Sequence, residues 1–159
     1  MTEYTGEWDR AAVAAFLADV RVPIRVACRT PGGSLWMLSL WYDFDPDAAE
    51  FVCATAAGAD VVEYLRADDG VAIEVSTNHP PYRGVRGNGS ATISPDDGTA
   101  VLRGLLERYL DGTDSSLAER LLDPDRDEVA IRIDPSHIYS WDFSDRMRDV
   151  SVASDPSSG

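Results

Sequence analysis

The stretch from Leu35 to Tyr42 constrains the fold more than any other part of the chain, because it is apolar on both faces of an expected strand. Its faces are Leu35, Met37, Ser39 and Trp41 on one side, and Trp36, Leu38, Leu40 and Tyr42 on the other. One face of an antiparallel sheet normally meets water. The second apolar face therefore needs a partner, and a helix, a second subunit or a flat ligand would each serve.

The sequence around this strand predicts further short strands interrupted by helices. Two-residue alternation between turn signals predicts strands, and apolar residues at 3.6-residue spacing predict helices. The expected strands are 22–29, 35–42, 51–55, 71–76, 82–93, 128–134 and 137–142; the expected helices are 8–20, 59–67, a segment capped by Asp96 or Asp97 that reaches Leu110, and a short helix with Ser116 and Glu119 in capping-box spacing. This order predicts an α+β fold, an antiparallel, Greek-key-like β-barrel with helical insertions. We expect one domain over residues 1–148 and a flexible acidic tail over 149–159.

Connections and glycines add three finer expectations. The acidic segment 43–50 is expected to be a turn, and Pro135-Ser136 a tight turn between the last two strands. Gly87 and Gly89 fall on one face of the same strand. Two missing side chains on one face indicate the close approach of another backbone or of a ligand.

Composition excludes several classes of function. The net charge is −14, and all of the 14 basic residues are arginine. This charge removes the attraction that drives binding to nucleic acid or to an anionic membrane. Without lysine the chain cannot form a P-loop or a lysine Schiff base. No apolar stretch approaches the ~18 residues of a spanning helix, and residues 1–4 do not resemble a signal peptide, so we expect no membrane association and a cytoplasmic location.

The two cysteines and two histidines are expected to be structural. Cys28 and Cys53 each lie inside an apolar run, which is typical of buried, reduced thiols. His79 and His137 are isolated from each other and from the cysteines. No metal site is therefore expected.

Arginines and aromatic residues on or beside the expected strands form the most suggestive constellation. Its members are Arg25, Arg83, Arg86, Trp36, Trp41, Tyr82 and Trp141. Guanidinium groups bind phosphate or electronegative ring atoms, and aromatic faces cover planar heterocycles. The alternative is that the aromatic residues belong to the core and that the arginines pair with the abundant carboxylates.

The order of the elements also resembles a known family. The segments that carry the resemblance are Ile24-Arg25-Val26-Ala27-Cys28, a glycine turn, Leu38-Ser39-Leu40-Trp41-Tyr42, Phe51-Val52-Cys53-Ala54-Thr55, a helix that ends at Leu65, Pro80-Pro81-Tyr82-Arg83-Gly84-Val85-Arg86-Gly87-Asn88-Gly89, Ile133-Asp134-Pro135 and Trp141-Asp142-Phe143. Over residues 9–147 the chain resembles the pyridoxamine 5'-phosphate oxidase-like superfamily of FMN-binding split β-barrels. No single segment is diagnostic, but their order and spacing together are specific.

The resemblance implies a homodimer that holds FMN, or another flavin or a deazaflavin, in a groove between the subunits. It places the isoalloxazine ring along the strand 35–42 and the ribityl-phosphate arm near the end of the strand 51–55. The cofactor-binding residues that it implies are Arg25, Ser39, Leu40, Trp41, Thr55, Arg83, Arg86 and Trp141.

Individual roles follow from the same resemblance. Arg86 would stabilise negative charge on the reduced ring, and Trp41 or Trp141 would cover it. Arg25 or Arg83 would meet the phosphate. No residue is assigned as a general base.

One departure from the family concerns the phosphate anchor. FMN-binding relatives carry a small hydroxyl residue and a Lys or Arg after the third strand, where this chain has Ala59 and Val61. Neither side chain can donate a hydrogen bond. Either another arginine replaces the anchor, the cofactor differs, or flavin binding has been lost.

The sequence therefore predicts a flavin-dependent oxidoreductase that acts on a small organic substrate, with the chemistry supplied by the cofactor. The alternative is a non-catalytic flavin, deazaflavin or haem carrier or sensor on the same fold, which the residues at 59 and 61 favour. A third reading, a structural dimer with an empty groove, would follow if the arginines all pair with carboxylates.

Overall fold

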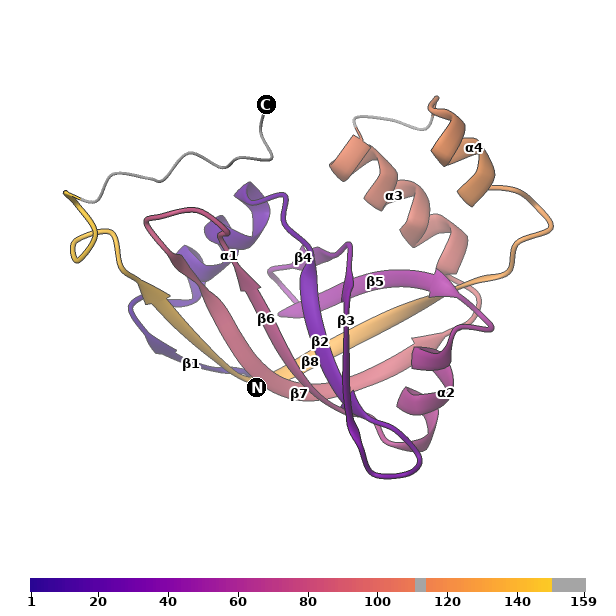
Figure 1. The fold of residues 1–159 in the computed structure, drawn as a ribbon, viewed down its shortest axis with the longest axis horizontal. Helices are drawn as coiled ribbons and strands as arrows, with labels where there is room; N and C mark the ends of the chain where they lie inside the picture. Colours follow the sequence, from indigo (N-terminus) through magenta and orange to yellow (C-terminus); the bar gives the residue numbers. More distant parts are fainter. Residues whose placement is uncertain (111–113, 150–159) are drawn as a thin grey trace.

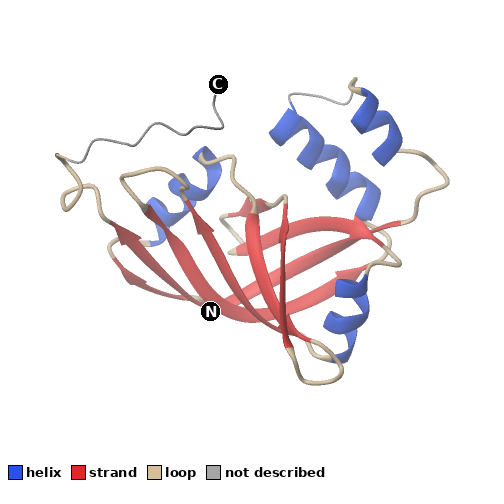
Figure 2. Ribbon diagram, viewed as in Figure 1, coloured by secondary structure: helices blue, strands red, loops and turns tan. Residues whose placement is uncertain are grey.

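The computed structural model describes residues 1–110 and 114–149, which form a curled, mostly antiparallel sheet with helices packed around it (Figures 1 and 2). The strands are β1 (Glu3–Gly6), β2 (Ile24–Arg29), β3 (Leu35–Leu40), β4 (Asp43–Asp45), β5 (Glu50–Ala56), β6 (Gly70–Ser76), β7 (Arg83–Ser94) and β8 (Glu128–Asp142); the helices are α1 (Arg10–Asp19), α2 (Asp60–Ala67), α3 (Gly98–Leu110) and α4 (Ser116–Leu121). Neighbouring strands follow the order β3-β2-β6-β7-β8-β5-β4, and β1 pairs with β8 in parallel. The predicted α+β barrel is confirmed, as an open sheet.

Most of the expected elements are present, and the differences lie at the connections. The two strands expected around Pro135 are one strand, β8, so the predicted turn at Pro135-Ser136 is wrong. Pro135 faces Gly89 across a register shift in the β7–β8 pairing. A bulge tolerates proline because the missing N–H is not needed for the ladder there.

The acidic segment 43–50 is not wholly a turn. Its first residues form β4, which pairs with β5, and the ring centroid of Phe44 lies 4.8 Å from that of Phe51. Asp45 Oδ1 then accepts hydrogen bonds from the backbone N–H groups of Asp47 and Ala48, which closes the turn itself.

Two further assignments from the sequence need correction. The short strand β1 had no counterpart among the expected strands. Helix α4 is capped by Ser115, not by Ser116, because the Ser115 hydroxyl accepts the Ala118 N–H at 3.0 Å. The expected tail falls almost wholly on residues 150–159, which lie outside the described residues.

The face of β7 that carries Gly87 and Gly89 lies against another backbone, which is one of the two alternatives that the sequence predicted. A Cβ at Gly87 would lie 2.1 Å from the His137 carbonyl oxygen, and one at Gly89 would lie 2.2 Å from the Asp134 oxygen. Both oxygens belong to β8. The glycines thus let β7 and β8 pack tightly where the sheet bends.

Both cysteines are free and buried in the barrel core, as predicted. Burial raises the pKa of the Cys53 thiol to about 12. Burial also raises the pKa of Cys28, with a smaller contribution from the charge of Asp68.

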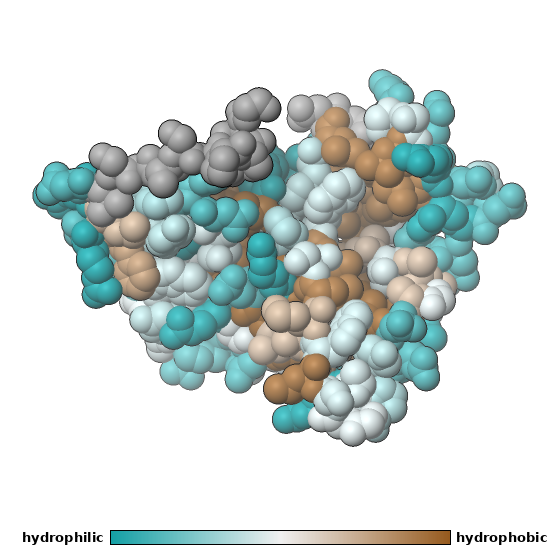
Figure 3. Space-filling view, in the orientation of Figure 1, coloured by the Kyte–Doolittle hydropathy of each residue, from teal (hydrophilic) through white to brown (hydrophobic). Residues whose placement is uncertain are grey.

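Strand β3 is an edge strand with an apolar outer face. Trp36 and Leu38 pack against the core, and the Trp36 ring meets Tyr64 edge-on at 5.3 Å. On the other face Leu35 and Met37 are 81% and 60% exposed. Hydrophobic side chains are gathered across this part of the surface (Figure 3). One face of the strand therefore packs on the core, and the other face has no partner within the described part of one chain.

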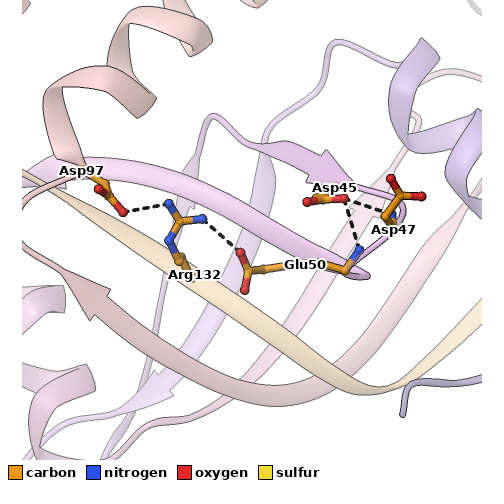
Figure 4. A network of polar contacts seen from close by, with 6 residues as sticks. Asp45, Asp47, Glu50, Asp97 and Arg132 are labelled. Carbon is orange, nitrogen blue, oxygen red and sulfur yellow. Dashed lines mark hydrogen bonds and ion pairs between the residues drawn. The ribbon is translucent and has the colours of Figure 1, made fainter.

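Helix α3 is fastened to the barrel at both ends. Arg132 of β8 bridges Asp97, just before the helix, and Glu50 of β5, at 2.9 and 3.0 Å (Figure 4). At the other end, the Arg108 guanidinium donates to the Leu17 and Val20 carbonyl oxygens at the end of α1, both at 2.8 Å. These contacts fix the helix as a wall beside the end of β3.

Candidate functional site

A groove with a volume of ≈ 500 Å³ runs between the end of β3, the end of β5 and the inner side of α3 and α4. Its lining residues are Pro23, Ser39, Leu40, Trp41, Ala54, Thr55, Ala56, Leu102, Leu105, Leu121, Arg126 and Glu128. Ser39, Leu40, Trp41 and Thr55, which the resemblance assigned to the cofactor from two separate strands, are thus brought together here. We call this the β3–α3 groove.

An aromatic pair forms part of the groove wall. The Trp41 ring stacks on Tyr109 of α3, with centroids 5.1 Å apart and planes 8° from parallel. The Tyr109 hydroxyl donates to the Val22 carbonyl at 2.9 Å and accepts the Tyr42 N–H at 3.4 Å. Burial raises the pKa of Tyr109, so this hydroxyl stays protonated and keeps both bonds at neutral pH. These hydrogen bonds fix Tyr109, and its ring in turn holds the ring of Trp41 in place.

The polar residues Arg126 and Glu128 also line the groove, and the sequence analysis did not single them out. Nε of Arg126 donates to Oε1 of Glu128 at 3.1 Å, and Nη2 lies 3.0 Å from the same oxygen, which makes the two side chains an ion pair. The Glu128 side chain is only 4% exposed, whereas that of Arg126 is 43% exposed. No local sequence signal marks them, because their position depends on strand pairing: Glu128 lies opposite Ala56, next to Thr55.

Arg25 lies beside the groove without lining it. Its Nη1 donates to the carbonyl of Pro23, a lining residue, at 3.5 Å. Across the sheet, Arg25 is paired with Ser39 of β3 on one side and with Glu74 of β6 on the other. The arginine thus borders the groove at the end of β3.

Arg86 and Trp141 lie elsewhere, on the outer surface of β7 and β8. The guanidinium carbon of Arg86 is 4.4 Å from the ring centroid of Tyr139 and 5.5 Å from that of Trp141. Cation–π contact of this kind holds the guanidinium while leaving its N–H groups available. We call these three residues the outward cluster.

Arg83 does not join Arg86, although only two residues separate them. Its guanidinium lies 5.5 Å from the ring centroid of Phe16, a residue of α1. The spacing of three along a strand places the two arginines on opposite faces.

None of Arg25, Arg83 and Arg86 forms an ion pair with any residue in 1–110 or 114–149. The reading in which these three arginines are neutralised by neighbouring carboxylates is therefore not what the described chain shows. For the aromatic residues the alternative holds in part, because Trp36 packs on the core.

The structure also explains why residues 59 and 61 offer no anchor. Ala59 is the N-cap of α2 and makes no side-chain capping bond. Val61 is 1% exposed and belongs to the core cluster. An anionic ligand in the β3–α3 groove would need another donor.

Solved structures share this fold at low sequence identity. The conserved hypothetical protein Rv2991 from Mycobacterium tuberculosis superposes with a TM-score of 0.73 at 21% identity, covering 96% of each chain. An F420 reductase gives 0.59 at 22% identity, over 77% of this chain and 93% of the other. A FAD-binding protein from Mesorhizobium loti gives 0.58 at 21% identity, over 84% and 93%.

No family model matches the chain, and no curated protein sequence matches it. The structural matches, which include a pyridoxamine 5'-phosphate oxidase-like protein, confirm the split-barrel fold that the resemblance implied. Within the described residues, no helix is long and apolar enough to cross a membrane.

Proposed function

We propose that the chain binds a flavin or deazaflavin in the β3–α3 groove and is an oxidoreductase for a small organic substrate. The observation that carries the proposal is the convergence of Ser39, Leu40, Trp41 and Thr55 on one concave site. The family resemblance assigns the same four residues to the cofactor, independently of the groove. The names of the F420 reductase and the FAD-binding protein with this fold agree with such a ligand.

The groove has the size and polarity that an elongated flavin requires. Its ≈ 500 Å³ falls within the usual range of small-molecule sites, about 300–1,000 Å³. The stacked Trp41 offers a flat wall for a ring, and leucines such as Leu102 make the lining beside it apolar. A charged pair, Arg126 and Glu128, is available for polar parts of the ligand.

A bound flavin would supply hydride or electron transfer, and the protein would supply position and electrostatics. Trp41 orients the ring, and Ser39 offers a hydroxyl at the groove. FMN is the flavin that we propose first, because it combines a planar ring with a short arm and one phosphate.

We further propose that the chain is a homodimer that pairs through the outer face of β3. An exposed edge strand with apolar side chains such as Leu35 and Met37 is a ready association surface. A second chain would also give the outward cluster a route to the cofactor of its partner. Light scattering tests the dimer: a mass near 17.3 kDa at micromolar concentration would contradict it.

An absorption spectrum of freshly purified protein, followed by titration with FMN, riboflavin and a deazaflavin, tests the cofactor. We expect a flavin spectrum or saturable quenching of tryptophan fluorescence, because Trp41 lines the groove. Absence of binding by all three ligands would overturn the proposal.

The second candidate, a non-catalytic carrier or sensor, is favoured by one observation. Arg126 and Glu128 are already bonded to each other, so the described lining residues offer no free acid or base. For haem, the same residues include no His, Cys, Met or Tyr that would ligate iron. Reduction of the bound flavin by a nicotinamide or deazaflavin donor, followed by turnover, would separate an enzyme from a carrier.

A further inference from the structure

We propose that Arg126, positioned by the buried carboxylate of Glu128, binds the phosphate of the cofactor and replaces the anchor that Ala59 and Val61 lack. The inference rests on the proposed function, because it assigns one part of the same ligand to one part of the same groove. It concerns two residues of this chain, Arg126 in the loop after α4 and Glu128 at the first position of β8.

Electrostatics require a local cation for such a ligand. The chain carries a net charge of −14, so an anion approaching it meets a repulsive overall field. Arg126 is the one arginine among the lining residues in the part of the chain that the structure describes. A phosphate in the groove would therefore depend on this side chain more than on any other.

The geometry of the pair leaves donors free. Oε1 of Glu128 accepts the Nε–H, and Nη2 lies 3.0 Å from the same oxygen. A guanidinium has five N–H groups, and the Nε–H is the one that donates a hydrogen bond within the described residues. Nη1 has no hydrogen-bond partner in residues 1–110 and 114–149. Arg126 is also 43% exposed, which lets a ligand reach it.

Glu128 acts as a positioning residue in this arrangement. A long, exposed arginine loses side-chain entropy when it binds an anion. Here the hydrogen bond and the ion pair with a carboxylate that is itself 4% exposed have already fixed the guanidinium. The fixed fork can then meet a phosphate with its remaining N–H groups at a smaller entropic cost.

The distribution of groups along the groove agrees with this orientation. Trp41 and Leu40 come from the end of β3, while Arg126 and Glu128 come from the segment that enters β8 beside Thr55 and Ala56. Thr55 is where the resemblance placed the ribityl-phosphate arm. A ring on Trp41 and a phosphate on Arg126 would use both parts of the groove.

The test is a set of fluorescence titrations with FMN and with riboflavin, which differ only in the phosphate. A charge-assisted hydrogen bond to phosphate corresponds to about a tenfold to hundredfold change in affinity. We expect Arg126→Gln to weaken FMN by this factor and to change riboflavin by less than about twofold. Arg103→Gln removes the same charge from an exposed position of α3 outside the groove, and should change neither.

Glu128→Gln separates positioning from charge. The amide retains an oxygen for Arg126 but loses the ionic bond, so FMN affinity should fall by less than in Arg126→Gln, with riboflavin unchanged. A rise in FMN affinity would show that Glu128 opposes the phosphate, and would overturn its positioning role.

Other outcomes are equally decisive. Unchanged FMN affinity in Arg126→Gln, or an equal loss for riboflavin, overturns the phosphate assignment while the flavin site itself survives. If wild type binds neither flavin, the proposed function and this inference both fail. Should Arg126→Gln not fold, wild type alone gives the answer: FMN must bind more tightly than riboflavin, because without a local cation the net charge of −14 would weaken the binding of FMN. A gap that is absent or reversed would overturn the inference.

Discussion

The β3–α3 groove and the outward cluster both combine an arginine with aromatic rings, yet they are physically different sites. In the groove, Arg126 is bonded to a buried carboxylate and Trp41 is braced by Tyr109. In the outward cluster, Arg86 rests on the rings of Tyr139 and Trp141 and has no carboxylate partner in the described chain. The first region is concave and preorganised; the second presents a cation on the outer face of a sheet.

The difference teaches that composition alone cannot locate a site on a curled sheet. Arg83 and Arg86 look like one basic element in the sequence, but the strand pleat sends them to α1 and to the outer surface respectively. Arg126 lies far away in sequence from Ser39, and the β5–β8 pairing brings it to the same groove.

The largest expected effect is on the free energy of unfolding, and it compares strand β7, which carries Arg86 of the outward cluster, with helix α3 beside the groove. Gly87→Ala would place a Cβ 2.1 Å from the His137 carbonyl oxygen, so β7 or β8 must move. We expect a loss of several kcal/mol (~3 or more) in unfolding free energy, or failure to fold, as for other severe backbone clashes. Gly104→Ala in α3 meets nothing within 4 Å and should stabilise by about 0.5–1 kcal/mol. Urea denaturation measures both, and equal effects would contradict the close-packed β7–β8 pairing.

The two buried thiols should cause a loss of folding stability of intermediate size at alkaline pH. The pKa of Cys53, next to the groove residues Ala54 and Thr55, is raised by burial to about 12 from an ordinary value of 9.0. The unfolded state therefore releases this proton first, and stability is lost as pH rises from about 9 to about 12. Melting temperature should fall over that window, and less steeply in Cys53→Val. Burial raises the pKa of Cys28 as well, so Cys28→Val should also flatten the fall. An unchanged slope in Cys53→Val would show that Cys53 does not carry the effect.

A smaller effect compares the tryptophans of the two regions as ligand contacts. Trp41→Ala removes a lining residue of the groove and should weaken flavin by about tenfold, in line with the stacking of an aromatic ring. Trp141→Ala should weaken it by no more than about threefold, because only a partner chain could bring the outward cluster to the ligand. Titration of riboflavin, which has no phosphate, isolates the ring. Equal losses of riboflavin affinity in the two variants would mean that both regions contact one cofactor. A loss in Trp141→Ala alone would mean that the flavin binds at the outward cluster and not in the groove.

Much of the barrel was predictable from local patterns. Alternation of apolar residues marked the strand that contains Ile24 and Val26, and the glycine pair at 87 and 89 predicted a close approach that β8 provides. The continuity of β8 through Pro135 was not predictable locally. It depends on Gly89 of another strand, which faces the proline across a bulge.

The candidate site was predictable where it follows one strand and not where it depends on pairing. Ser39, Leu40 and Trp41 came from a single segment, and all three line the groove. Arg126 follows Pro124 in an acidic loop and carries no local signal. Its place is set by the register of Ala56 with Glu128, a long-range fact that a single sequence does not display.

The smallest expected effect is the dependence of the melting temperature on salt, compared between an arginine without an ion pair and one that forms two. With a net charge of −14, self-repulsion opposes folding at low ionic strength, so melting temperature should rise by a few degrees as NaCl is added. Arg103→Gln, at an exposed position of α3, adds one unit of net negative charge without breaking an ion pair or a cation–π contact within the described residues, so its deficit should vanish in high salt. Arg132→Gln breaks the two contacts that fasten α3 beside the groove, at 2.9 and 3.0 Å, and part of its deficit should remain. Differential scanning calorimetry at low and molar salt measures all three proteins. A wild-type melting temperature that is flat or falling would show that the acids are already balanced locally by arginine.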